Sequence, residues 1–121
     1  MKDLFEFNYD FFSFPMKIKV MTFQNRSELE DYFDLVEIYN SSASFHIKDG
    51  EMYVALNENN YDRPREYVHE FLHAVKHYLN HLGINDEETE CYMLGYLVQT
   101  YTDFLEIHKQ KIEEFKDQFI T

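Results

Sequence analysis

Cysteine, glycine, proline and positively charged residues are all scarce in this chain of 121 residues, and each scarcity excludes something. Cys91 is the single cysteine, so no intramolecular disulfide can form, and a chain without disulfides suits a reducing compartment. Three glycines and two prolines leave little material for long loops. The longest apolar runs fall short of the roughly 18 residues of a membrane-spanning helix, so none is expected.

Bases are outnumbered by acids, 11 against 23, which gives a formal net charge of −12. This charge repels phosphate backbones and anionic lipids, so nucleic acids and membranes are disfavoured as partners. Acidity of this degree keeps a small aromatic-rich protein soluble. An alternative is an acidic face that mimics nucleic acid or binds a basic protein. The first 15 residues lack the features of a signal peptide, so the expected location is the cytoplasm.

Apolar residues are abundant, at 45% of the chain with 18% aromatic, which predicts a packed core. The length corresponds to one domain spanning residues 1–121. The phenylalanine-rich residues 1–15 must be buried or form an interface. Their pattern leaves open an irregular arm, a short helix or part of a strand.

Hydrophobic periodicity predicts an α+β fold, a small sheet with helices on one side. Residues 16–23 alternate as a strand, and residues 27–39 form a helix capped by Asn25, or by a capping box of Ser27 and Glu30. Residues 43–48 and 52–56 form a hairpin around Asp49-Gly50.

Two helices are expected in the second half of the chain. The first begins near Pro64 and stops at Gly83, because proline suits a first helical turn and glycine suits the position after a last one. The second opens at Asn85 or Asp86 and continues towards residue 115, either as one helix or with a break near residues 102–103.

The first of these helices carries the motif HExxH, formed by His69, Glu70 and His73. Residues four apart stack on one helical face, so the two imidazoles can bind one metal ion. Glu70 can then reach a water molecule on that ion without being a ligand itself. This division of roles is typical of zinc hydrolases.

A helical wheel places the three motif residues opposite the apolar face of the helix. The motif therefore has two interpretations. In the first, the three motif residues are ordinary polar residues on an exposed helix face. In the second, that face is the floor of a cleft, and another element supplies a third zinc ligand from across the cleft.

The acidic start of the next helix is the expected source of that third ligand, because a short turn at Gly83 brings the two helices side by side. Glu88 is favoured because Glu88, Cys91, Gly95 and Val98 follow one another at helical spacing. They form a stripe that is expected to face the first helix. Gly95 would then allow close approach of the helices. Glu90, on a neighbouring stripe, is the second choice, and Glu87 remains open. A structural alternative makes Glu88 part of a capping box with Asn85.

Other ligands are less favoured by spacing. A longer HExxHxxGxxH motif is excluded because Lys76 and Leu79 stand where it needs glycine and histidine. His77 and His81 continue the i+4 series but rotate about 40° per step around the helix, so they are expected at the surface. His46 is expected to be structural, and Cys91 to pack in the core.

HEFLHAV, followed by Glu88-x-x-Cys91-Tyr92-x-x-Gly95-Tyr96, resembles the gluzincin-like zinc metallopeptidases. It is most similar to small HExxH proteins encoded by phages and prophages, over residues 52–98. The resemblance implies zinc ligated by His69, His73 and Glu88, with Glu70 as general base, and Cys91 stands where the family usually has alanine. It also implies a substrate-aligning strand, for which Met52–Leu56 is the candidate.

The expected function is therefore a zinc-dependent peptidase acting on a peptide or protein substrate. No residue stands out as the group that stabilises the oxyanion. The alternative is a non-catalytic acidic interaction protein with a degenerate or structural HExxH motif.

Overall fold

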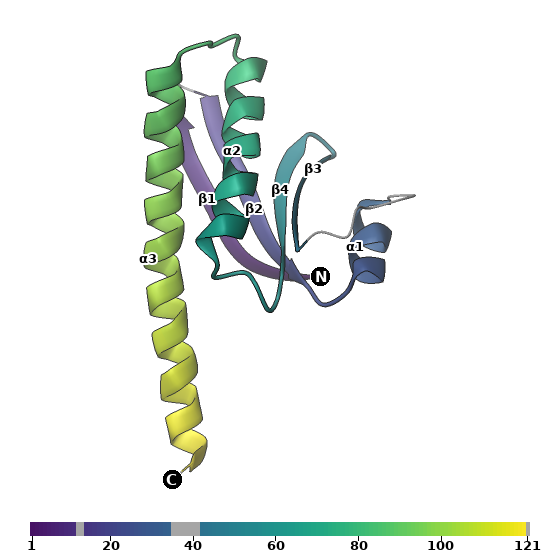
Figure 1. Ribbon diagram of the computed structural model, residues 1–121, viewed down its shortest axis with the longest axis vertical. Helices are drawn as coiled ribbons and strands as arrows, with labels where there is room; N and C mark the ends of the chain where they lie inside the picture. Colours follow the sequence, from purple (N-terminus) through teal and green to yellow (C-terminus); the bar gives the residue numbers. More distant parts are fainter. Residues whose placement is uncertain (12–13, 35–41, 121) are drawn as a thin grey trace.

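A computed structural model describes residues 1–11, 14–34 and 42–120 (Figure 1). The elements follow the order β1 (Lys2–Phe11), β2 (Phe14–Phe23), α1 (Arg26–Phe33), β3 (Ala43–Lys48), β4 (Glu51–Asn57), α2 (Pro64–His81) and α3 (Glu87–Ile120). The α+β class is confirmed. Every helix in the described part of the chain is too short or too polar to cross a membrane.

The four strands form one mixed sheet in the order β1-β2-β4-β3. β1 pairs antiparallel with β2, so the phenylalanine-rich N-terminal residues form an edge strand, one of the possibilities that their sequence left open. β2 pairs parallel with β4, and β3 pairs antiparallel with β4. β4 therefore lies inside the sheet, and β1 and β3 are the two edge strands of the sheet.

Alternation along the strands gives the sheet two different faces. Ile18 and Val54, both fully buried, belong to the main core with α2 and α3. Ala55, the next residue of β4, belongs to a smaller cluster with Phe23 and with Leu29 of α1. The long helices thus share one face, and the short α1 packs against the other (Figure 1).

Local capping signals account for most helix ends. The Asn25 side chain accepts a hydrogen bond from the Glu28 amide, so Asn25 caps α1 and the alternative capping box at Ser27 is not used. α1 ends at Phe33, before the expected end, because Asp34 adopts a left-handed conformation. Residues 35–39 of the predicted helix lie outside the described residues.

The predicted hairpin and the predicted limits of α2 are confirmed. Asp49 and Gly50 both have positive φ, as a two-residue hairpin turn requires. Pro64 begins α2, and Gly83, with φ of 72°, follows its C-cap. The Gly83 amide donates to the carbonyl of Asn80 and the Ile84 amide to that of Leu79, which closes the helix end.

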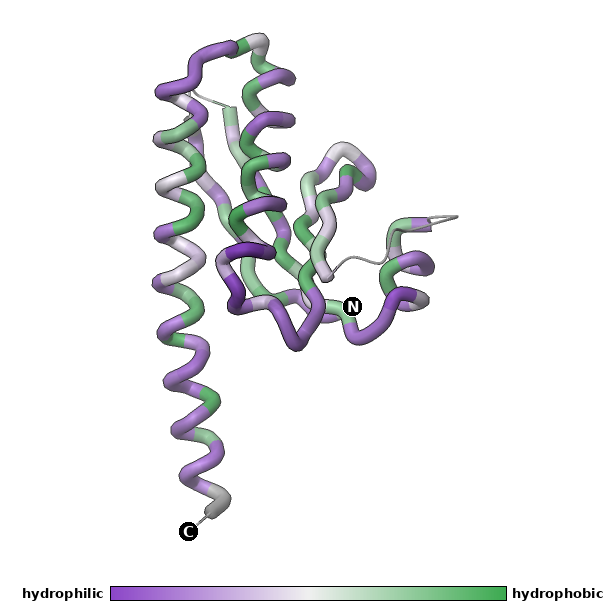
Figure 2. The backbone as a smooth tube through the Cα atoms, viewed as in Figure 1, coloured by the Kyte–Doolittle hydropathy of each residue, from purple (hydrophilic) through white to green (hydrophobic). Residues whose placement is uncertain are grey.

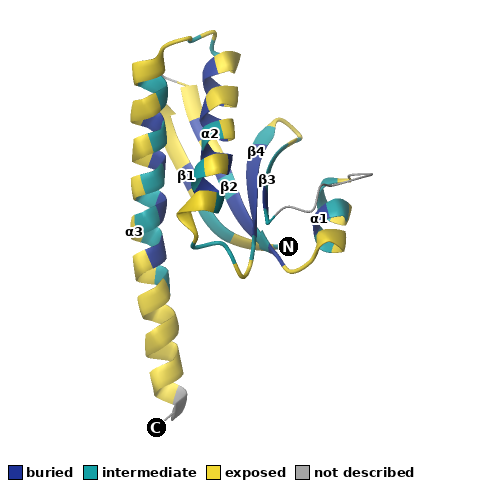
Figure 3. Cartoon of the chain, viewed as in Figure 1, coloured by how far each residue is buried: buried dark blue, intermediate teal, exposed yellow. Residues whose placement is uncertain are grey.

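α3 is a single helix of 34 residues without the break considered near residues 102–103. It begins after Asp86, one of the two residues that the sequence offered as its start, and the Asp86 carboxylate accepts a hydrogen bond from the Thr89 hydroxyl. Its C-terminal part extends beyond the sheet, and residues 109–118 are exposed (Figure 3). Figure 2 shows that this extension is mostly hydrophilic.

Candidate metal centre and its surroundings

The two histidines of the HExxH motif lie on the side of α2 that turns away from the core. Tyr67, Phe71 and Ala74 of the same helix are buried, whereas His69 and His73 are exposed. The amphipathic pattern fixes this orientation, because the apolar side of α2 is held between the sheet and α3. The two histidines are therefore accessible from solvent.

The two imidazoles are brought together. Nε2 of His69 and Nε2 of His73 lie 3.3 Å apart, and the ring planes are inclined by 75°. Zinc–nitrogen bonds of about 2.0–2.1 Å at tetrahedral angles separate two ligand nitrogens by about 3.3–3.4 Å. The spacing of this pair therefore fits two ligands of one tetrahedral ion.

Glu70, which the helical wheel placed with the two histidines opposite the apolar face, instead points towards the protein interior, so the wheel was wrong for this residue. It is only 7% exposed, and its Oε1 lies 3.8 Å from Nε2 of His69. Burial raises the pKa of Glu70, while the neighbouring His69 and His73 act in the opposite direction. A half-desolvated carboxylate is a stronger base than a fully hydrated one, and this property suits a group that accepts a proton.

The strand beside this face of α2 is β3. The Phe45 ring of β3 is stacked near His73, with centroids 6.5 Å apart, and also contacts His77 at 5.9 Å. The main-chain carbonyl of Ser42 accepts from the Asn57 amide. In an antiparallel pair, the main-chain groups of alternate residues point to the partner strand. Because those of Ser42 point to β4, those of Phe45 and Ile47 point away from β4, to the open edge of the sheet.

The expected substrate-aligning strand was wrong. Met52–Leu56 lies in β4, which hydrogen-bonds to β2 on one side and to β3 on the other, so it has no edge to offer a substrate. Sequence could identify both strands of the hairpin. It could not show which of them pairs with β2, because that choice is made by long-range packing.

The stripe of α3 expected to face α2 was also wrong. Glu88, Cys91 and Gly95 are exposed, so Cys91 does not pack in the core. A Cβ added to Gly95 would meet no described neighbouring atom within 4 Å, so this glycine allows no close helix approach. The buried side of α3 is instead formed by residues four apart, Met93, Leu97, Tyr101 and Leu105.

Glu90, the second choice for the third ligand, does contact α2. Its Oε1 lies 2.8 Å from Nζ of Lys76. Further along the two antiparallel helices, the hydroxyl oxygen of Tyr67 lies 3.5 Å from that of Thr102. These pairs place His73 level with residues 93–96. At 1.5 Å per residue, Glu90 is roughly 5–9 Å and Glu88 roughly 8–12 Å from that level along the axis.

Within the described ranges, no three His, Cys, Asp or Glu side chains converge as a metal site. The pair of His69 and His73 is thus assembled, and its third partner is not. Glu88 stays a prediction as the third ligand, and along the helix axis Glu90 lies nearer than Glu88 to the level of His73.

The remaining histidines considered from sequence divide into two groups. His77 and His81 are exposed, as predicted. His46 is half-buried, its Nε2 lies 2.7 Å from the Ser44 hydroxyl oxygen and its ring stacks on the Phe33 ring at 4.2 Å, so it has the partners that a structural role requires. Burial lowers the pKa of His46.

Comparison of this chain with protein-family models, with curated proteins and with solved structures finds no match.

Proposed function

We propose that this protein is a zinc-dependent peptidase whose metal is held by His69 and His73. The observation that carries the proposal is the 3.3 Å separation of the two Nε2 atoms, together with the adjacent buried carboxylate of Glu70. The resemblance of the HExxH helix and the following acidic helix to gluzincin-like peptidases supports the same interpretation.

Glu70 is the proposed general base. The chemistry that a zinc ion supplies in such a site is polarisation of the substrate carbonyl and acidification of a water molecule. Glu70 would be the group that takes a proton from the attacking water, and its burial makes the carboxylate more basic than a hydrated one. The same residue can then return the proton to the leaving amine.

β3 is proposed to align the substrate. The outward main-chain groups of Phe45 and Ile47 can pair with an extended peptide, as edge strands do in other peptide-binding proteins. Phe45 lies next to His73, so a peptide bound along β3 would run past the histidine pair. An extended segment is therefore a better substrate than a folded one.

The third ligand is proposed to be a carboxylate from the first turns of α3. Glu88 is the residue favoured by the resemblance, and Glu90 is the one favoured by its contact with α2. Glu90 would exchange its ion pair with Lys76 for the metal. Because both partners of this pair are partly exposed, the pair itself contributes little stability, at most about 1 kcal/mol.

Metal content tests the histidine pair. Purified protein is stripped with a chelator, reloaded with zinc and dialysed, and bound zinc is measured by elemental analysis. We expect one zinc per wild-type chain and loss of zinc from His69→Ala and His73→Ala. His77→Ala, an exposed histidine one step along the same helix, is the matched control and should retain zinc.

Catalysis is tested separately from binding. Glu70→Gln should keep zinc and lose cleavage of an unstructured peptide library, and Glu88→Ala and Glu90→Ala show which carboxylate holds the metal. A wild-type chain that takes up no zinc would refute the proposal and favour the alternative, an acidic interaction protein. Zinc uptake without cleavage of any peptide would retain the metal site and reject the peptidase.

A further inference from the structure

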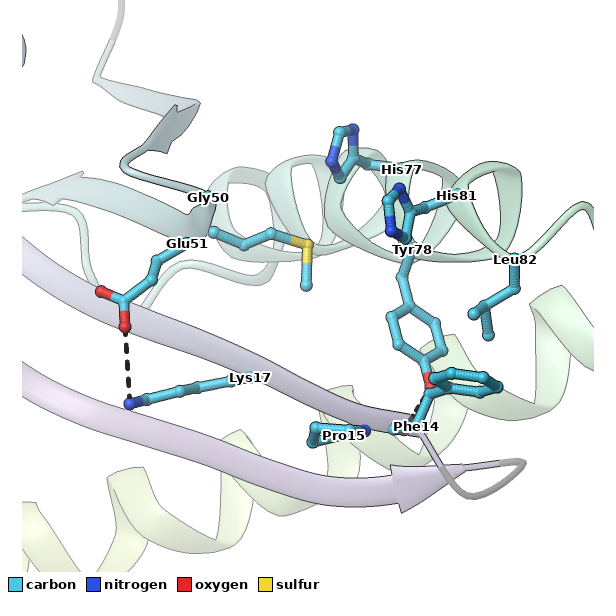
Figure 4. Close-up of a pocket in the computed structure, with 10 residues that line it drawn as sticks. Phe14, Pro15, Lys17, Gly50, Glu51, His77, Tyr78, His81 and Leu82 are labelled. Atoms are coloured by element: carbon cyan, nitrogen blue, oxygen red, sulfur yellow. Dashed lines mark hydrogen bonds and ion pairs between the residues drawn. The ribbon is translucent and has the colours of Figure 1, made fainter.

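A cavity of about 370 Å³ lies beside the C-terminal end of α2 (Figure 4). Its walls come from the last two turns of α2, the start of β2 and the turn between β3 and β4. Pockets for small ligands span about 300–1,000 Å³, so this volume suits a small molecule or a single residue of a peptide. The HExxH residues do not line it.

The floor of the cavity is apolar. Met52 and Leu82 line it together with the ring of Tyr78, whose hydroxyl donates to the Phe14 carbonyl at 2.6 Å. This hydrogen bond ties the start of β2 to α2 and fixes the distance between two walls. The Phe14 ring is 57% exposed at the wall, where an apolar ligand would cover it.

Among the described residues that line the cavity, Glu51 is the one carboxylate, and it is already paired. Glu51 accepts from Lys19 at 3.0 Å and from the Tyr53 hydroxyl at 3.1 Å, and Lys17 lies 3.7 Å away. The hydrogen bond from Lys19 is the main reason that the pKa of Glu51 is lowered. A cationic ligand would have to displace these donors, so this carboxylate favours no cation.

Hydrogen-bond donors, in contrast, remain available. His77 and His81 line the cavity, and neither imidazole ring has a hydrogen-bond partner among the described residues. Each imidazole carries at least one N–H donor. The Lys17 ammonium is 43% exposed and has a proton to spare beyond its contacts with Glu6 and Glu51. The polar side of the cavity is therefore complementary to an acceptor.

We propose that this cavity binds a carboxylate attached to an aromatic or branched apolar group. The apolar group occupies the floor formed by Met52 and Leu82, and the carboxylate accepts from His77 and His81. The chemistry is shared by a free small acid and by the C-terminal residue of a peptide. Binding requires neither zinc nor the pair of His69 and His73, so this site and the proposed peptidase can fail independently.

The test uses zinc-free, ¹⁵N-labelled full-length protein titrated with N-acetylphenylalanine and followed by amide chemical shifts. We expect saturable shifts centred on Gly50 and Leu82. N-acetylphenylalanine amide, which lacks the carboxylate, should bind at least tenfold more weakly. The tripeptide Ala-Ala-Phe distinguishes the sources: binding tighter than that of the free acid indicates a peptide C-terminus, and binding of the acid alone indicates a small metabolite.

Two variants locate the site. The double change His77→Gln and His81→Gln should weaken binding of N-acetylphenylalanine at least tenfold, whereas His69→Gln with His73→Gln, on the same helix outside the cavity, should leave it unchanged. Leu82→Trp, which fills the cavity, should abolish binding while the spectrum remains that of a folded chain. Equal binding of acid and amide, no saturable shift up to 20-fold excess, or shifts that map elsewhere would overturn the proposal.

Discussion

Replacing Tyr101 with phenylalanine removes one buried hydroxyl from the centre of the molecule. Tyr101 is fully buried, its ring lies 4.8 Å from that of Tyr67 and 5.2 Å from that of Phe71, and its hydroxyl donates to the Tyr61 carbonyl at 2.8 Å. It thus fixes α3 to both α2 and the loop before α2. Burial raises the pKa of Tyr101 well above its usual value, so the hydroxyl remains a donor at all pH values of interest.

The expected cost follows from what is left behind. Tyr101→Phe keeps the ring contacts and leaves the Tyr61 carbonyl without its donor, which costs about 1–3 kcal/mol. Tyr101→Ala also removes the ring and should cost at least a further 3 kcal/mol or so. For a chain of this length each kcal/mol lowers Tm by about 3–6 °C.

Urea unfolding followed by circular dichroism measures both changes, and an unchanged m-value shows that the unfolding transition is comparable. Tyr92→Phe is the matched control, because Tyr92 lies on the same helix but is 68% exposed. It should change the free energy of unfolding by less than about 0.5 kcal/mol. If Tyr101→Phe were as stable as wild type, the hydrogen bond to Tyr61 would not contribute as argued.

Two further predictions concern backbone conformation and pH. Gly83→Ala should destabilise the protein by about 1–2 kcal/mol because φ is +72° there, whereas Gly95→Ala, within a helix, should stabilise it by about 0.5–1 kcal/mol. An added Cβ has free space at both positions, so the change in the free energy of urea unfolding reports backbone conformation alone. A change of the same sign in both variants would contradict this explanation. Burial lowers the pKa of His46 from 6.5, so the folded state binds the proton less readily and wild type should lose stability as pH falls below about 6.5. In melting curves measured between pH 5 and 7.5, His46→Gln should reduce this loss of stability, whereas the exposed-site variant His81→Gln should not. Identical pH profiles for wild type and His46→Gln would rule out the lowered pKa of His46 as the cause.

Local signals in the sequence predicted a large part of the fold. The Asp49-Gly50 turn, Pro64 at the start of α2 and Gly83 after its end all occur where expected, because each depends on the φ angle that one residue can adopt. The spacing of His69 and His73 likewise follows from helical geometry alone, and it places their Nε2 atoms at a distance suited to one ion.

Two wrong expectations, the stripe of α3 that faces α2 and the substrate-aligning strand, depended on orientation between elements. An i, i+3, i+7 pattern defined several stripes on α3, and only packing selected the stripe through Met93 and Leu97 over the one through Glu88. Both strands of the hairpin had suitable sequences, and only pairing with β2 made β4 internal and β3 the edge.

The sequence by itself therefore determined the fold class, the hairpin, the limits of α2 and the histidine pair. Tertiary structure alone decided which strand borders the motif, that Glu90 pairs with Lys76 of α2, and that His77 and His81 line a cavity together with Glu51. The physical reason is that a helix or turn is specified by neighbouring residues. The rotation of one element against another is specified by the whole buried surface that they share.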